Sequence, residues 1–203
     1  MKLVLRSLLV IVALAAAAPF AEAAPVTWKV DSTHTEVSFQ VRHFFSKVRG
    51  VFHAVEGTIV YDESDFALIK VDAVVKVASV DTGNERRDGH LQTPDFFDAE
   101  KNPTLSFKST AVKPVAKDKF KITGDLTMRG VTKQVTFDAQ FLGAGDIVID
   151  GKARGSKAGF AATTTVNRKD FGINWNKTLD NGGTVLEDSV TIVLNIEADK
   201  AQQ

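Results

Sequence analysis

Alternation of apolar and polar residues along most of the chain is the feature that most constrains its fold. In residues 36–42, Val37, Phe39 and Val41 alternate with polar residues. Successive side chains of an extended strand point to opposite faces, so this pattern is typical of a strand with one buried and one wetted face. No long segment has helical periodicity. We predict eight strands, within 36–42, 51–61, 68–80, 104–112, 120–128, 133–142, 159–167 and 188–198.

Short turn signals separate these predicted strands, for example at 117–119 and 128–130. Half-polar strands joined by short turns favour antiparallel pairing, because parallel pairing needs long crossovers and almost fully apolar strands. Closing such a sheet removes its edges and leaves an interior for side chains or one small ligand. We therefore predict an all-β fold, a single eight-stranded antiparallel barrel, with a sandwich as the alternative. The glycine-rich segment 143–159 is predicted to be a loop.

The first residues have the pattern of a secretory signal peptide. Basic residues precede an apolar run at 8–18, and Ala-Glu-Ala at 21–23 has the small-x-small form that signal peptidase recognises. The apolar run is shorter than the roughly 20 residues that span a bilayer. We predict a signal peptide over 1–23, a mature domain over 24–203, a periplasmic location and no integral membrane segment.

Composition excludes several classes of function. The 25 Lys and Arg residues balance the 25 Asp and Glu residues, which gives no electrostatic reason to expect nucleic acid or an anionic membrane surface as a partner. The absence of cysteine excludes thiol chemistry and disulfide-stapled folds. The four histidines, His34, His43, His53 and His90, form no metal-binding motif, and no Gly-x-Ser-x-Gly elbow occurs. We expect no catalytic residue, no metal and no cofactor.

The segment 81–107 is the one long interruption of the strand pattern. Charged residues and His90 are concentrated at 85–90, and Phe96 and Phe97 follow. Loops held by a rigid scaffold commonly carry functional sites, so we predict a functional centre here with a short helical segment. An acid–base group of Arg87, Asp88 and His90 is the enzymatic alternative, and an Arg–Asp pair that fixes the loop is the structural one.

Several motifs resemble the YceI-like family, in the family's order and over nearly the whole predicted mature chain. They are DSTH at 31–34, VRH at 41–43, VRG at 48–50, RDGHL at 87–91, DFFDAEKNPTLSFKST at 95–110, GDLTMRGVTKQVTF at 124–137 and NRKDFGINWN at 167–176. Proteins of this family are lipocalin-like barrels that bind long apolar molecules, including polyisoprenoids, in an interior pocket. The resemblance implies an exported carrier or binding protein for a polyisoprenoid, an isoprenoid quinone or a related lipid.

We expect two sets of ligand-binding residues. The apolar pocket is predicted to contain Phe39, Val41, Phe45, Val75, Phe96, Phe97, Phe107 and Phe137. The polar head of the ligand is predicted to lie at the pocket mouth beside His43, Arg87, His90 and Arg168. Three alternatives stay open: a barrel filled by its own side chains, an Arg168–Asp170 pair that only stabilises a turn, and a stress-response interaction protein. A homodimer also stays open.

Overall fold

The structure is a computed structural model that describes residues 26–62, 65–180 and 182–202, so the predicted signal peptide lies outside the described residues. Within them the chain forms antiparallel strands and one short α-helix. The strands are β1 (Val26–Val30), β2 (Glu36–His43), β3 (Ser46–Phe52), β4 (Val55–Asp62), β5 (Asp65–Lys76), β6 (Val80–Asp81), β7 (Thr104–Ala116), β8 (Lys119–Met128), β9 (Val131–Ile149), β10 (Lys152–Asn167) and β11 (Leu186–Lys200). The helix is α1 (Glu85–Gln92), and η1 (Val77–Ser79) and η2 (Arg168–Phe171) are short 3₁₀ turns.

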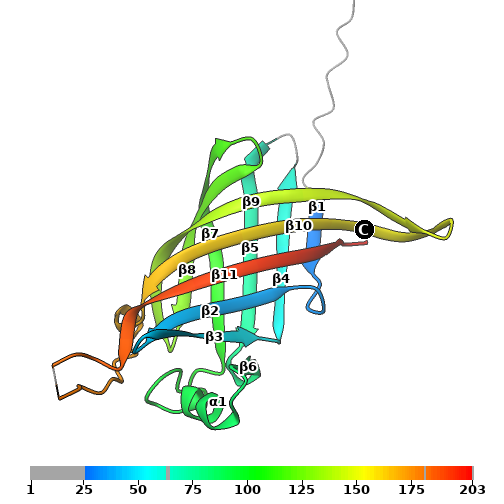
Figure 1. Cartoon of the computed structure of the whole chain (residues 1–203). Helices are drawn as coiled ribbons and strands as arrows, with labels where there is room; N and C mark the ends of the chain where they lie inside the picture. The colour runs from blue at the N-terminus through cyan, green and yellow to red at the C-terminus, as the bar shows by residue number, and fades with distance from the viewer. Residues whose placement is uncertain (1–25, 63–64, 181, 203) are drawn as a thin grey trace, which may run out of the picture.

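The sheet closes on itself. Its strands follow the order β1-β4-β5-β7-β8-β9-β10-β11, and β11 pairs back onto β1, which makes a ring of eight antiparallel strands. Strands β2, β3 and β6 extend one side of this ring (Figure 1). The predicted eight-stranded barrel is therefore confirmed, and so is the short helical segment of the long loop, which is α1.

Two strands of the barrel are broken. β11 pairs with β2 from Leu186 to Asn195 and then with β1 from Ala198 to Lys200, so β1 and β2 act as two halves of one strand. β3 and β4 form the next strand in the same way. The sequence pattern missed β1 and most of β3. The inward position at the centre of β3 is Gly50, which interrupts the apolar alternation.

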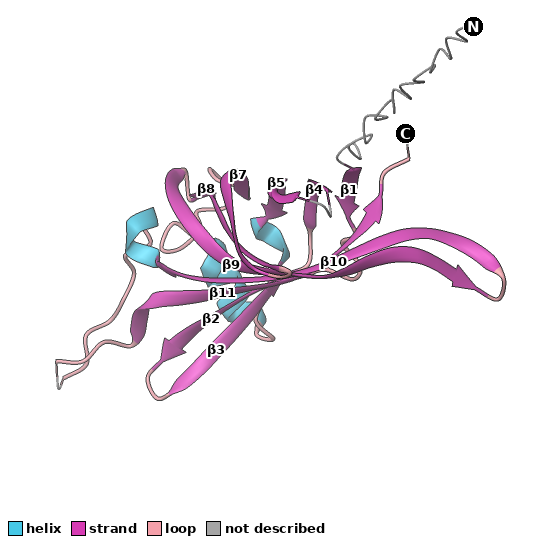
Figure 2. Ribbon diagram, turned by 90° about the horizontal axis from the view of Figure 1, so that it is seen from above, coloured by secondary structure: helices cyan, strands magenta, loops and turns pink. Residues whose placement is uncertain are grey.

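The prediction of a loop at 143–159 is wrong. β9 and β10 continue as a two-stranded ribbon that projects beyond the barrel (Figures 1 and 2). Pairing runs from Gly159–Gly143 out to Lys152–Ile149, with a register shift between Ala153 and Ser156. Most of the ribbon side chains are exposed, and so the apolar alternation that marks a half-buried strand is missing.

The barrel interior has two hydrophobic clusters. One, which we call the aromatic end, contains the buried rings of Trp28, Tyr61, Phe120 and Phe160. The other includes Phe96 and Phe97 from the loop after α1 and Phe171 from η2, together with strand residues. We call this second region the loop end; in Figure 1 α1 lies below the barrel, opposite the β7–β8 turn of the aromatic end. No helix among the described residues is long and apolar enough to cross a membrane.

Candidate functional site

A cavity of about 710 Å³ occupies the barrel interior between the two clusters. Small-molecule sites typically measure about 300–1,000 Å³, so the cavity has room for a ligand and the barrel is not filled by its own side chains. Seven of the eight predicted pocket residues line it: Phe39, Val41, Val75, Phe96, Phe97, Phe107 and Phe137.

Strand alternation explains why the wall is apolar. On β5, for example, Ile69, Val71, Ala73 and Val75 all line the cavity, whereas Lys70 and its neighbours in the other phase do not. Strands β2, β8, β9, β10 and β11 contribute aliphatic and phenylalanine side chains in the same way. Such side chains carry no polar group that needs a partner, so the wall can enclose hydrocarbon without an unsatisfied donor or acceptor.

Two glycines make room for wall residues. A Cβ atom at Gly50 would lie 2.3 Å from the ring of Phe39, and one at Gly124 would lie 2.5 Å from the ring of Phe107. The phenylalanine rings therefore lie against bare backbone of the neighbouring strand. Because a larger residue at either glycine would displace a ring, the two glycines help to set the free volume of the cavity.

The prediction that Phe45 lines the pocket is wrong. β2 ends at His43 and β3 begins at Ser46, so Phe44 and Phe45 form a two-residue turn. The Phe45 side chain is fully exposed and does not line the cavity. The inward phase of β2 runs through Phe39, Val41 and His43, and extrapolating it by two residues points to Phe45. The left-handed backbone of Phe44, with φ of 52°, turns the chain before the alternation can continue.

The polar lining lies almost entirely at the loop end. Apart from Ser38 and Ser106, the polar residues in contact with the cavity are His43, Thr82, Asn84, Arg86, Arg87, His90 and Arg168. All four predicted mouth residues are among them. The cavity is thus an apolar chamber with polar groups gathered on one side.

Thr82 organises the start of α1. Asn84 caps the helix by accepting a hydrogen bond from the Arg87 amide at 3.0 Å. The Arg87 guanidinium donates to the Thr82 hydroxyl and to its carbonyl, each at 2.7 Å, and Asp88 accepts from the Thr82 amide and hydroxyl. Arg87 and Asp88 therefore both bind Thr82, and the Arg–Asp pair considered from the sequence is not formed.

His90 joins α1 to the loop that follows η2. Its Nε2 atom lies 2.8 Å from the Asp95 carboxylate, and its ring packs edge-on against Phe96 and Trp175. Asp88 and His90 thus have separate partners, Thr82 and Asp95. They do not converge on one reacting position, as an acid–base group requires.

Arg168 lines the cavity but uses most of its donors on the protein. The residue is 3% exposed, and its side chain donates to the carbonyls of Glu187, Ile173 and Trp175 and to Asp188 at 2.7–3.0 Å. Its acidic partner is Asp188, so the alternative of an Arg168–Asp170 pair is wrong. Lys169 and Arg168 hold the pKa of Asp188 below its usual range. Arg168 therefore anchors the segment after η2 to the start of β11.

Family comparison agrees with this architecture. The YceI-like domain matches residues 28–198, which is most of the chain. The chain belongs to the YceI-like family. A UPF0312 protein of Staphylococcus aureus strain N315 is 34% identical over 168 residues, which cover 82% of this chain and 94% of the relative. The family resemblance of the sequence motifs is confirmed.

Solved structures share the YceI-like barrel. The YceI protein of Campylobacter jejuni is 32% identical, with a TM-score of 0.66 over 79% of this chain and 90% of that one. BcnA of Burkholderia cenocepacia has a TM-score of 0.71 at 23% identity, covering 83% of this chain and 98% of its own. A polyisoprenoid-binding domain from Saccharophagus degradans has a TM-score of 0.61 at 12% identity, covering 87% and 99%. The last two matches show the fold alone.

Arg129 is a residue of this YceI-like chain whose role the sequence did not reveal. It donates to the carbonyl of Gly172 and to that of Pro94, each at 2.9 Å, and so ties the loops after α1 and η2 together. Arg129 and Gly130 form the two-residue turn between β8 and β9, with φ of 51° and 74°. Asn-Gly is the usual pair in such turns. The arginine in the first position was therefore the sequence feature that could have indicated a role beyond the turn.

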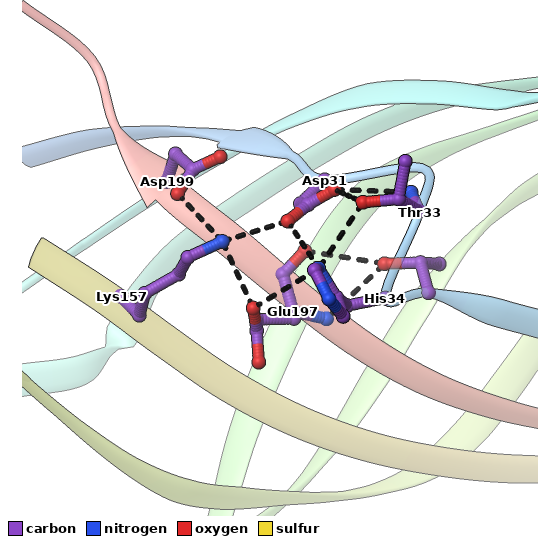
Figure 3. Close-up of polar contacts among 7 residues, drawn as sticks. Asp31, Thr33, His34, Lys157, Glu197 and Asp199 are labelled. Carbon is purple, nitrogen blue, oxygen red and sulfur yellow. Dashed lines mark hydrogen bonds and ion pairs between the residues drawn. The ribbon is translucent and has the colours of Figure 1, made fainter. Parts of the chain in front are cut away.

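A second polar cluster lies outside the aromatic end, where β11 changes partner from β2 to β1 (Figure 3). The Lys157 ammonium donates to Asp31 at 2.7 Å and to Glu197 and Asp199 at 2.9 Å, and His34 Nδ1 lies 2.8 Å from Asp31. We call these five residues the seam cluster. Asp31, His34 and Glu197 have the ligand types of a metal site, but the lysine ammonium already bridges the two carboxylates.

The seam cluster shifts the protonation of its members. The Lys157 ammonium, with Thr33 and His34, holds the pKa of Asp31 well below its usual range. Asp31 in turn raises the pKa of His34 by hydrogen bonding, and Glu197 adds to the effect. The pKa of Lys157 is raised because it donates to Asp31, Asp199 and Glu197. The cluster is therefore an ion-pair network that holds the broken strand to β10 and β11.

Proposed function

We propose that the protein is an exported carrier that sequesters one long apolar lipid inside its barrel. The observation that carries this proposal is the cavity of about 710 Å³, whose wall is apolar except at the loop end. A chain-like ligand with a polar head fits this distribution, with the hydrocarbon toward the aromatic end and the head at the loop end. A polyisoprenoid, an isoprenoid quinone or a related lipid has this form.

Burial of hydrocarbon supplies enough free energy for stable carriage. If the cavity removes about 400 Å² of lipid surface from water, the gain is about 10 kcal/mol at roughly 25 cal/mol per Å². Association costs several kcal/mol, which lowers the net affinity. The remainder still favours the bound lipid, because the free lipid is almost insoluble in water. A lipid acquired in the cell should therefore remain bound through aqueous purification.

The residues lining the cavity at the loop end support a head group bound there. His43, Arg86, Arg87 and His90 line the cavity there, and Arg86 makes no ion pair with any described residue. Arg87 uses its Nε and Nη2 atoms on Thr82, which leaves Nη1 to meet an oxygen of the ligand. Arg168 has most of its donors committed to the protein, so in this proposal it shapes the mouth and contributes less to head-group binding than the other three predicted residues.

A binding role without catalysis is part of the proposal. Asp88 and His90 are held by different partners and offer no shared position for a reacting atom. The solved domain from Saccharophagus degradans, which has this fold, is described as polyisoprenoid-binding. Export rests on the sequence pattern of residues 1–23. Intact mass of protein from the periplasmic fraction should place the mature N-terminus near Ala24.

The decisive experiment is organic extraction and mass spectrometry of natively purified protein. We expect about one apolar molecule per chain. Phe137→Asp should remove it, because an unpaired carboxylate in the wall is costly. Gln140→Asp on the outer face of the same strand, opposite Lys119, is the matched control and should keep it.

A milder substitution distinguishes loss of the ligand from unfolding of the barrel. Phe107→Trp adds volume to the wall and should reduce ligand length or occupancy while the circular dichroism stays β-rich. The carrier proposal fails if wild-type protein yields no lipid, takes up no added polyprenyl or quinone ligand, and shows no change of thermal midpoint when such a ligand is added.

A further inference from the structure

The turn between β2 and β3 lies beside the mouth of the cavity. His43, the last residue of β2, lines the cavity, and its ring packs edge-on against Phe44 with 4.4 Å between ring centroids. The Phe44 amide donates to the Val185 carbonyl at 3.0 Å. Figure 2 shows this turn projecting on the same side of the molecule as the segment between η2 and β11. The turn therefore lies next to His43 of the cavity wall and outside the barrel core.

Phe44 and Phe45 are poor choices for a turn whose only task is to reverse the chain. Two-residue hairpin turns favour Gly, Asn and Asp. Phe44 instead has φ of 52°, which is strained for a bulky side chain, and it is 41% exposed. Phe45 is fully exposed and packs against nothing that the structure describes. Water therefore surrounds one aromatic ring completely and a second one in part.

Basic residues flank the two rings. Arg42 and Lys47 are direct cross-strand partners on the outer face, a pairing of like charges that is unfavourable. Arg42 lies 3.5 Å from Glu187, whereas Lys47 makes no ion pair within the described part of the chain. The turn therefore combines strain, exposed aromatic surface and an excess of positive charge, none of which benefits the isolated fold.

We propose that the β2–β3 turn docks on the surface of an anionic lipid bilayer, with Phe44 and Phe45 among the head groups and Lys47 and Arg42 beside lipid phosphates. Exposed aromatic rings next to basic side chains match the chemistry of the membrane interface. The near-zero charge of the whole chain gives no such attraction, so the contact is local. The inference rests on the proposed carrier function, because docking would place the mouth against the source of the lipid.

Co-sedimentation with vesicles tests the contact directly. With vesicles of equal parts phosphatidylglycerol and phosphatidylcholine, we expect Phe45→Ser to weaken binding at least about tenfold, as expected for removing one buried phenylalanine. The thermal midpoint should not fall, because the ring makes no contact in the fold. Val115→Ser is the matched control: it removes a side chain that is 61% exposed at the β7–β8 turn of the aromatic end, and it should bind like wild type.

A second variant tests whether vesicle binding requires the basic side chain. Lys47→Ala should weaken binding to the same vesicles about fivefold and should have almost no effect on pure phosphatidylcholine vesicles. The proposal is overturned if wild-type protein does not bind the anionic vesicles. It is also overturned if Phe45→Ser binds as tightly as wild type, or if Val115→Ser loses as much.

Ligand uptake separates this proposal from the carrier function. Phe45→Ser should take up a polyprenyl ligand added from ethanol as completely as wild type, and should take it up at least several-fold more slowly from anionic vesicles. If wild-type protein binds anionic vesicles through Phe45 but no apolar ligand by any route, the docking proposal stands and the carrier function fails. Equal rates of uptake from vesicles by both proteins would overturn the docking proposal alone.

Discussion

The aromatic end and the loop end of the barrel are closed by different means. At the aromatic end, Tyr61 packs on Trp28 and Phe160, and Phe66 links Tyr61 to Phe120. The seam cluster outside them is held together by ion pairs to Lys157. At the loop end, the loop after α1 and the segment after η2 are held by hydrogen bonds from Arg129 and Arg168 and by the buried rings of Phe96, Phe97 and Phe171. One end is made of strand residues, and the other is made of loops attached to strands.

This difference suggests that one end determines the stability of the fold and the other determines the access of ligand to the cavity. Rings on neighbouring strands cannot move far without disturbing the barrel pairing, whereas a loop that takes no part in strand pairing can change position while the barrel stays closed. Polar lining residues and the aromatic β2–β3 turn are both at the loop end. We therefore expect substitutions at the aromatic end that leave the cavity wall intact to change mainly the free energy of unfolding, and those at the loop end to change mainly ligand exchange.

The largest effect is expected from Trp28→Ala. Trp28 is buried, stacks on Tyr61 and does not line the cavity, so its removal should cost about 3–5 kcal/mol of the free energy of unfolding and leave the ligand affinity of the folded protein unchanged. Trp175→Ala, at the loop end, should weaken ligand binding and leave the free energy of unfolding almost unchanged. Urea unfolding and ligand titration of both variants check this. Comparable stability losses would break the distinction between the two ends.

Gly50→Ala should reduce both stability and ligand capacity. The new Cβ would meet the Phe39 ring at 2.3 Å and push it from its place, at a cost of about 1–3 kcal/mol. Mass spectrometry of bound ligands should show a shift to shorter chains. Gly89→Ala in α1, where a Cβ has nothing within 4 Å, is the control and should be neutral or slightly stabilising. Phe39→Leu in the Gly50→Ala background should restore stability if the ring is the obstacle.

Lys157→Met tests the seam cluster. It leaves Asp31, Glu197 and Asp199 without their shared cation, but the lysine side chain is 28% exposed, so water replaces part of the interaction. We expect a loss of about 1–2 kcal/mol in urea unfolding, less than for a fully buried ion pair. Lys70→Met, at an exposed lysine on β5, should lose almost nothing. Unchanged stability in Lys157→Met would show that the seam cluster does not hold the broken strand.

The smallest effect concerns pH. The folded-state pKa of Asp31 is lowered, so its contribution is present above about pH 4, its unfolded value, and is lost as pH falls through the folded pKa. The pKa of His34 is raised, so its contribution is complete below about pH 6.5 and is lost as pH rises through the folded pKa. His34→Gln should therefore destabilise the protein more at pH 5.5 than at pH 8.5. Asp31→Asn should remove most of this difference, with Glu197 accounting for the remainder, and an undiminished difference in that background would assign it to another group.

The sequence predicted those features that follow from repeated local pattern. The alternation of apolar and polar residues predicted the barrel strands and most residues of the cavity wall, and the motifs identified the family. Sequence patterns failed where one residue acts through contacts with distant parts of the chain. Gly50 interrupts the apolar alternation, so most of β3 was not predicted. Arg129 was predicted only as a turn residue, although it ties two distant loops together. Phe45 was misplaced because alternation does not mark where a strand ends. The exposed ribbon carried no alternation because neither face meets the core.

The ribbon of β9 and β10 has a consequence for hydrogen exchange. Inside the barrel these strands are flanked by β8 and β11, whereas beyond it each has only the other as a partner. A two-stranded ribbon in water is marginally stable, so its amide protons should exchange by local opening. Protection should therefore fall along a single strand, from Phe137 toward Ile149, with the transition where the flanking strands stop. We therefore expect the closed ring to unfold as one cooperative unit, to which the outer parts of its two longest strands do not belong.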